Sequence, residues 1–141
     1  MADIKAILKS GLGEDEKEST GTGTIKDLIA KVFCTRNLLH FAHWKTTSYA
    51  QHQAVGSLYD SIVGQVDKIV EAYQGRFGLL DGLTTPRATV PKDILKHVES
   101  ESKWLCDNKC NIAQDNAAVE NLLDELEGMY LSTIYKLKNL R

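Results

Sequence analysis

Five side chains that commonly bind metal ions lie in one stretch of the chain: His40, His43, His52, Asp67 and Glu71. Imidazole and carboxylate donors together suit iron, zinc or manganese. A helix rises ~1.5 Å per residue, so His52 and Glu71 would stand roughly 28 Å apart on a single helix. If these groups share a metal ion, a second copy of the chain must supply half of the site.

Apolar residues at helical spacing predict the helix that carries the first two histidines. Thr24 and Asp27 form a capping-box pair that would begin this helix. Successive residues advance by roughly 100° around a helix, so His43 points in the same direction as the apolar stripe and His40 lies about 60° away. Both imidazoles are therefore expected on the core side. The stripe consists of Ile25, Leu28, Ile29, Val32 and Leu39.

A second amphipathic helix is predicted from Tyr49 to about Gln74, with Ser48 and Gln51 as its capping pair. Its apolar face is Val55, Leu58, Tyr59, Ile62, Val66, Ile69, Val70 and Tyr73. A second stripe lies beside this face and contains His52, Gly56, Asp60 or Gly64, Asp67 and Glu71. The last two are one turn apart, where like charges repel unless a cation lies between them.

Two glycines in the second stripe indicate close packing. Glycine at positions 56 and 64 destabilises the helix by ~1 kcal/mol each relative to alanine, and on an exposed helix nothing offsets this loss. The cost is understandable where another helix packs closely against both positions. We therefore expect a helix neighbour along this stripe.

Antiparallel packing of the second helix against its own copy would join the separated ligands. A two-fold axis near Ser61 and Ile62 would set His52 beside Glu71 of the partner subunit. His43, on the preceding helix, would complete the cluster. An interface of this isologous kind contains two equivalent sites.

The rest of the chain predicts two more helices and a long connection. Residues 75–90 contain three glycines and Pro86 and are typical of a crossover loop. The third helix is expected from Pro91 to about Asn108, and the fourth begins at Asp115 or Asn116. The predicted fold is therefore an all-α four-helix bundle over residues 24–141, with a long crossover between its second and third helices. Residues 1–9 are expected to form a short amphipathic helix, and residues 10–23 a glycine-rich, acidic linker.

Composition favours an ordinary soluble protein. Hydrophobic residues make up 43% of the 141 residues and the formal net charge is −2, so there is no general attraction to nucleic acid or anionic membrane. No apolar run reaches the length of a membrane span, and the first residues do not resemble a signal peptide. Cys34, Cys106 and Cys110 are an odd set, expected as buried, reduced thiols in the cytoplasm.

With these residues in place, the chain resembles the Dps miniferritins, the DNA-binding proteins from starved cells. The resemblance covers roughly residues 24–140, and it rests on the four-helix order and on His43-Trp44, His52, Leu58-Tyr59, Asp67 and Glu71. It implies a ferritin-like bundle that assembles into a hollow dodecamer, built from two-fold dimers, that oxidises Fe(II) with peroxide or oxygen and stores the iron. His43 and His52 would come from one subunit, Asp67 and Glu71 from its neighbour, and Trp44 would lie beside the site. Asp60 and His40 are additional candidate ligands.

The chain departs from that family in three ways. Gly56 stands where the family usually has an aspartate one turn after the second histidine, so a ligand is missing there. The segment between His43 and His52 is three residues shorter than usual. The basic tail that many members use to bind DNA is absent, so DNA binding is expected to be weak or absent.

Two alternative functions remain. A ferritin-like oligomer with a degenerate site would serve as a metal-binding or structural shell, and Gly56 is the main support for it. A zinc hydrolase on a histidine-bearing bundle would need a further histidine from the last helix, and residues 115–141 contain none. His97 is expected to be a surface histidine, and the acidic run Glu120, Asp124, Glu125 and Glu127 a solvated or cavity-facing side of the fourth helix.

Overall fold

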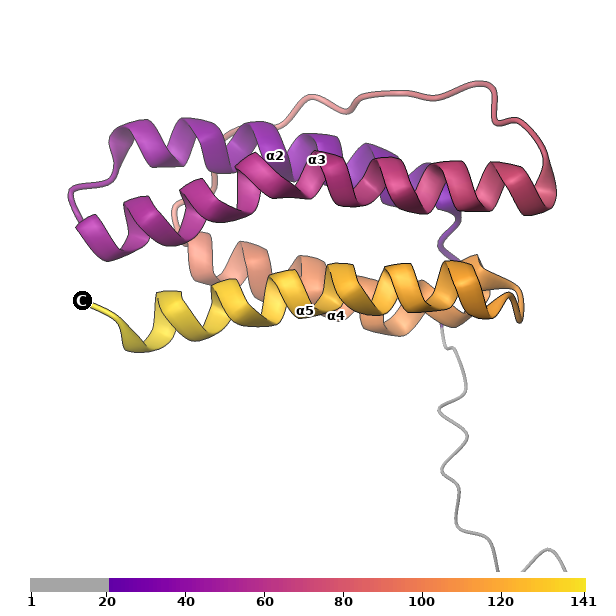
Figure 1. The fold of residues 1–141 in the computed structure, drawn as a ribbon. Coiled ribbons are helices and arrows are strands. Elements are labelled where there is room, and N and C mark those ends of the chain that lie inside the picture. Colours follow the sequence, from indigo (N-terminus) through magenta and orange to yellow (C-terminus); the bar gives the residue numbers. More distant parts are fainter. Residues whose placement is uncertain (1–20) are drawn as a thin grey trace, which may run out of the picture.

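A computed structural model describes residues 21–141, and every regular element in that range is a helix. The helices are α2 (Ile25–Lys45), α3 (Tyr49–Phe77), α4 (Ile94–Ala113) and α5 (Ala117–Asn139). They pack together as a four-helix bundle, as Figure 1 shows, which confirms the predicted all-α fold. The short helix predicted over residues 1–9, and most of the predicted linker, lie outside the described residues.

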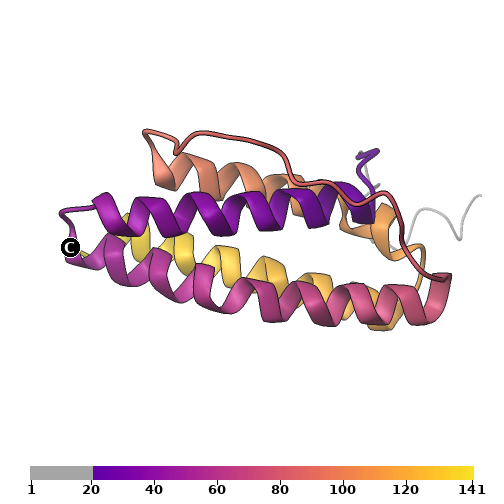
Figure 2. The same cartoon turned by 90° about the horizontal axis from the view of Figure 1, so that it is seen from above.

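The four helices form two layers of antiparallel pairs. Figure 1 shows α2 and α3 in one layer and α4 and α5 in the other, with α3 packed on α5. Residues 78–93 carry the chain back along the bundle before α4 begins, so α3 and α4 run in the same direction; Figure 2 shows this path from above. The long crossover between these two helices is therefore confirmed.

Each helix begins at a side chain that accepts a backbone hydrogen bond. The predicted capping box of Thr24 and Asp27 is present, and Ser48 accepts from the backbone of Gln51. The third helix was expected to begin at Pro91, but it begins at Ile94 because the Asp93 side chain accepts from the backbone N–H of Lys96. An aspartate in this role satisfies one of the free N–H groups of the first turn.

The core follows the apolar stripes of the sequence. Val32, Leu39, Val55 and Ile62 from the α2–α3 layer are fully buried. They meet buried side chains of the other layer, which include Val98, Leu105, Val119, Leu123, Leu126 and Tyr130. Burial of this surface is the main source of stability in a bundle of this size.

The residues just before α2 lie against α4. The Gly23 N–H donates to Asn108 Oδ1 over 2.7 Å, and Asn111 Nδ2 donates to the Gly23 carbonyl over 2.9 Å. A side chain at Gly23 would collide with Trp104 and Asn108. Glycine is therefore required for this close approach.

His97 is not the surface histidine that the sequence suggested. It is partly buried where α4 faces α2, and its Nε2 lies 3.0 Å from Thr35 Oγ1. Burial lowers the pKa of His97; Glu101 acts to raise the pKa, and Lys31 to lower it. The sequence did not show this because Thr35, its partner, lies 62 residues away on another helix.

The cysteines are only partly as expected. Cys34 and Cys106 are half-buried, but Cys110 is exposed. Its predicted burial is wrong because the core side of α4 in this region is occupied by Leu105 and Ile112. Within the described range no helix is long and apolar enough to cross a membrane.

Replacement of Leu39 by alanine should lower the free energy of unfolding by about 2–5 kcal/mol, because it leaves a cavity in a fully buried position. Urea denaturation followed by circular dichroism measures this. Leu131→Ala is the matched control. Leu131 is 54% exposed, so this variant should lose much less free energy of unfolding. Equal losses for the two variants would contradict this assignment of the core.

The wild-type protein should lose stability on acidification partly through His97. Its pKa in the folded state lies below the ordinary value of 6.5, so the unfolded chain takes up the proton first as the pH falls. The free energy of unfolding therefore declines below about pH 6.5 and continues to fall until the folded state is also protonated. His97→Gln should make this decline shallower in urea titrations between about pH 7.5 and 5. Parallel pH profiles would contradict the prediction.

Candidate metal centre

His43 and His52 meet where α2 turns into α3. The Nδ1 atom of His43 lies 2.9 Å from the carbonyl oxygen of His52, and the Nδ1 atom of His52 lies 3.0 Å from the carbonyl oxygen of His43. The rings stack with their centroids 3.5 Å apart and their planes 20° from parallel. The structure thus brings together the two histidines that the sequence assigned to one subunit.

These contacts determine which ring nitrogens are available. A carbonyl oxygen only accepts hydrogen bonds, so Nδ1 of each ring must be the donor. In the neutral imidazole the lone pair is then on Nε2. Metal-binding histidines usually have this arrangement, with one nitrogen bonded to a carbonyl or carboxylate and the other free for the ion.

The same two hydrogen bonds also hold the helical hairpin together. The last carbonyl groups of a helix have no partner within the helix. The His43 carbonyl is in the last turn of α2, and His52 supplies a donor from the first turn of α3. The pair is therefore a structural link between α2 and α3 as well as a candidate ligand set.

Gly56 makes room for the His43 ring. A Cβ atom at position 56 would lie 3.2 Å from both Cε1 and Nδ1 of His43. The close helix neighbour expected at Gly56 is therefore α2 of the same subunit. At Gly64 the expectation is not met within one subunit, because no atom would lie within 4 Å of an added Cβ.

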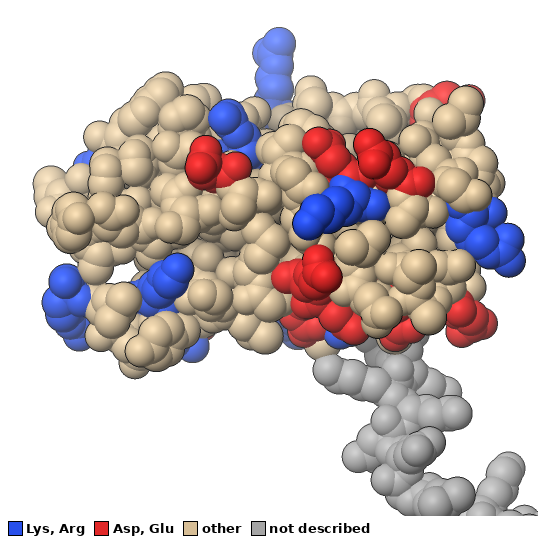
Figure 3. Space-filling model, viewed as in Figure 1, with Lys and Arg blue, Asp and Glu red and all other residues tan. Residues whose placement is uncertain are grey.

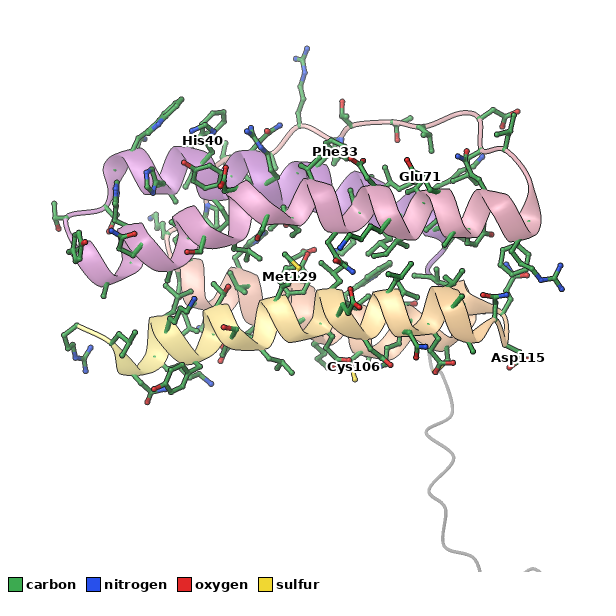
Figure 4. All side chains as sticks on the ribbon, in the orientation of Figure 1. Phe33, His40, Glu71, Cys106, Asp115 and Met129 are labelled. Atoms are coloured by element: carbon green, nitrogen blue, oxygen red, sulfur yellow. The ribbon has the colours of Figure 1, made fainter. Side chains whose placement is uncertain are left out.

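His40 lies in an aromatic cluster that adjoins the histidine pair through Tyr59. Its ring stacks on Tyr59 at 4.2 Å and lies 4.8 Å from the ring of Trp44, while Tyr59 meets His43 edge-on at 5.3 Å. Trp44 is 67% exposed. His40 is half-buried in the α2–α3 layer, where Figure 4 places it, and its ring lies at the contact between α2 and α3.

The carboxylates do not reach the histidines within one subunit. Asp67 and Glu71 are exposed and one turn apart on α3, which continues unbroken from His52. Asp60 is also exposed on this helix. No group of three or more metal-binding side chains forms among residues 21–141. Asp67 and Glu71 therefore lie apart from the histidines within one subunit, and a metal site that uses all four side chains would need a second chain.

Acidic groups are nevertheless prominent on the face of the bundle that carries α3 and α5. Figure 3 shows carboxylate groups over both α3 and α5, with Lys and Arg side chains among them. Glu71 lies in the α2–α3 layer, in which Figure 4 also shows Phe33 and His40. None of the ion pairs found in the described part of the chain uses Asp67 or Glu71.

The acidic run on α5 has a partner that sequence reasoning missed. Lys109 of α4 bonds to Asp124 and Glu127, each over 2.6 Å. Burial would lower the pKa of Lys109, but its hydrogen bonds to these carboxylates outweigh burial and raise the pKa. Glu125 accepts from Gln65 Nε2 over 3.1 Å. Much of the run predicted to be solvated therefore joins α5 to α4 and α3.

Gly56→Ala should destabilise the protein although alanine favours helices. The added methyl group should push the His43 ring away and weaken the paired hydrogen bonds, at a net cost of about 1–2 kcal/mol. Gly75→Ala is the control, because it lies in the same helix with open space around it and should gain up to ~1 kcal/mol. Urea denaturation compares the two. A stabilised Gly56→Ala variant would show that the ring does not need this space.

Comparison with known proteins gives a family but no activity. Residues 43–137 match a family described as a family of unknown function, DUF5856. The chain is also 24% identical over 125 residues to an uncharacterized 14.6 kDa protein from the mobD–ri intergenic region of Enterobacteria phage T4, covering 87% of this chain and 94% of that protein. No solved structure matches the chain. Since the matched region is more than half of the chain and contains all four bundle helices at least in part, the protein belongs to the DUF5856 family.

Proposed function

We propose that this protein binds Fe(II) at a site shared by two copies of the chain and oxidises it, in the manner of a Dps-like miniferritin. His43 and His52 of one subunit and Asp67 and Glu71 of its neighbour are the proposed ligands. Iron is the substrate, and the oxidised metal is stored inside a hollow oligomer, a dodecamer built from two-fold dimers. The protein acts in the cytoplasm, without DNA as a partner.

The observation that carries the proposal is the pair of hydrogen bonds that the two imidazoles exchange with each other's carbonyl groups. Both Nδ1 atoms donate to carbonyl oxygens, at 2.9 Å and 3.0 Å. Both Nε2 atoms therefore carry lone pairs in the neutral rings. Two nitrogen donors whose orientation is fixed by hydrogen bonds suit iron, zinc or manganese better than two surface histidines with no such bonds.

The exposed face of α3 supports the second half of the site. Asp67 and Glu71 are exposed on the helix that begins with His52, and their mutual repulsion would be relieved by a cation. The level midway between His52 and Glu71 falls at residues 61 and 62. Ile62 is fully buried in its own subunit, so Asp60 and Gly64, which are exposed, would lie at the two-fold contact in its place.

A structural shell without catalysis is the second candidate, and one observation favours it. A metal ion lies in the plane of a coordinated imidazole, ~2.0–2.1 Å from the nitrogen. Because the two rings stack at 3.5 Å with nearly parallel planes, one ion cannot lie in both planes. One ring must therefore turn, or each ring must meet its own ion. If neither happens, His43 and His52 serve only to join α2 to α3.

Iron oxidation distinguishes the two candidates. Metal-free protein is loaded anaerobically with Fe(II) and mixed with peroxide, and the Fe(III) absorbance is followed. The wild type should react about 10-fold or more faster than a His52→Ala, Glu71→Ala double variant, because the variant lacks a donor from each half-site. Asp81→Asn removes an exposed carboxylate of the crossover loop and should react like the wild type. Equal rates for the wild type and the double variant would remove the oxidase function.

A further inference from the structure

We propose that metal binding at His43 and His52 is coupled to self-association, so that a single subunit holds the ion poorly and an assembled pair holds it well. The inference rests on the proposed function and adds how that site is regulated. It follows from what surrounds the two imidazoles within one subunit. The partner is a second copy of this chain, which supplies the carboxylates.

Within residues 21–141 of one subunit, no carboxylate joins the histidine pair to form a group of three metal-binding side chains. The residue one turn after His52 is Gly56, which has no side-chain donor atom, and a Cβ atom added there would lie only 3.2 Å from the His43 ring. The next acidic residue on α3 is Asp60, about 12 Å along the helix axis from His52. No side chain from another element of the described chain completes a group of three donors.

The histidines cannot compensate by chelating one ion together. Their rings are stacked at 3.5 Å with planes 20° apart, and each Nδ1 is held by a carbonyl oxygen. In this arrangement each ring offers a single nitrogen in its own plane. A lone imidazole is a weak site, so the oxygen donors of the partner subunit decide the affinity.

The coupling is reciprocal. An ion that binds the pair of subunits but not the separate subunits shifts the equilibrium toward the pair by mass action. A two-fold interface contains two equivalent sites, so metal binding at each of them contributes equally to the shift in the association equilibrium. At a metal concentration ten times the dissociation constant of the paired site, self-association should tighten by about 100-fold.

The test uses Co(II), which prefers similar donors and is not oxidised in air under these conditions, with the full chain freed of metal by a chelator. Co(II) affinity is measured by titration at several protein concentrations, and association by sedimentation velocity. We expect the apparent affinity to rise with protein concentration, and Co(II) to shift the protein toward larger species. Glu71→Gln should lose both effects, whereas Asp81→Asn should retain both.

If the oligomer is too stable to separate on dilution, subunit dissociation is measured in urea instead. If the chelated protein stays assembled at the lowest concentration, Co(II) should still raise the urea concentration at which subunits separate, and Glu71→Gln should not show that rise. Tight Co(II) binding to separated subunits, or an unchanged dissociation midpoint, would overturn the coupling while leaving the iron site possible. Absence of Co(II) binding in every assembly state would instead remove the proposed function itself.

Discussion

The two hydrogen bonds exchanged between His43 and His52 are the interaction on which the candidate site depends. They close the turn between α2 and α3, satisfy a helix-end carbonyl and fix both imidazoles in one tautomer. The bundle provides the frame: α3 packs against α2 on one side and α5 on the other, and it is an unbroken helix. Along this helix Asp67 and Glu71 lie several turns from His52, so a metal ion bound by all three would need a second copy of the chain.

The fold was largely predictable because it depends on patterns that are local in sequence. Apolar residues at helical spacing predicted all four helices, and Thr24, Ser48 and Asn116 accept the backbone bonds expected at their starts. The start of α4 differs from the one predicted at Pro91 because the Asp93 side chain caps the helix. The buried position of His97 was missed because it depends on Thr35, which a single-helix pattern does not reveal.

The four ligands named from the sequence stay a prediction, whereas the packing around two of them differs from what the sequence indicated. The spacing of His52 and Glu71 predicted that these residues do not meet along one helix, and both lie on the unbroken helix α3. Gly56 was interpreted as a lost ligand, and the structure gives it a second meaning, since its missing side chain admits the His43 ring. The exchange of bonds between two histidines could not be foreseen, because it requires the exact angle between α2 and α3. In the sequence, this contact is indicated only by Gly56, which lies one turn after His52.

Metal binding by mixed subunits tests most directly whether the site is divided between two copies. His52→Ala and Glu71→Gln chains are unfolded and refolded together, and bound Co(II) is measured by equilibrium dialysis. Each variant alone should bind almost none. In a random mixture half of the dimers are mixed, and each of these contains one intact site, so about one quarter of the wild-type binding should return. Failure of the mixture to bind more than either variant alone would contradict the division of the site between subunits.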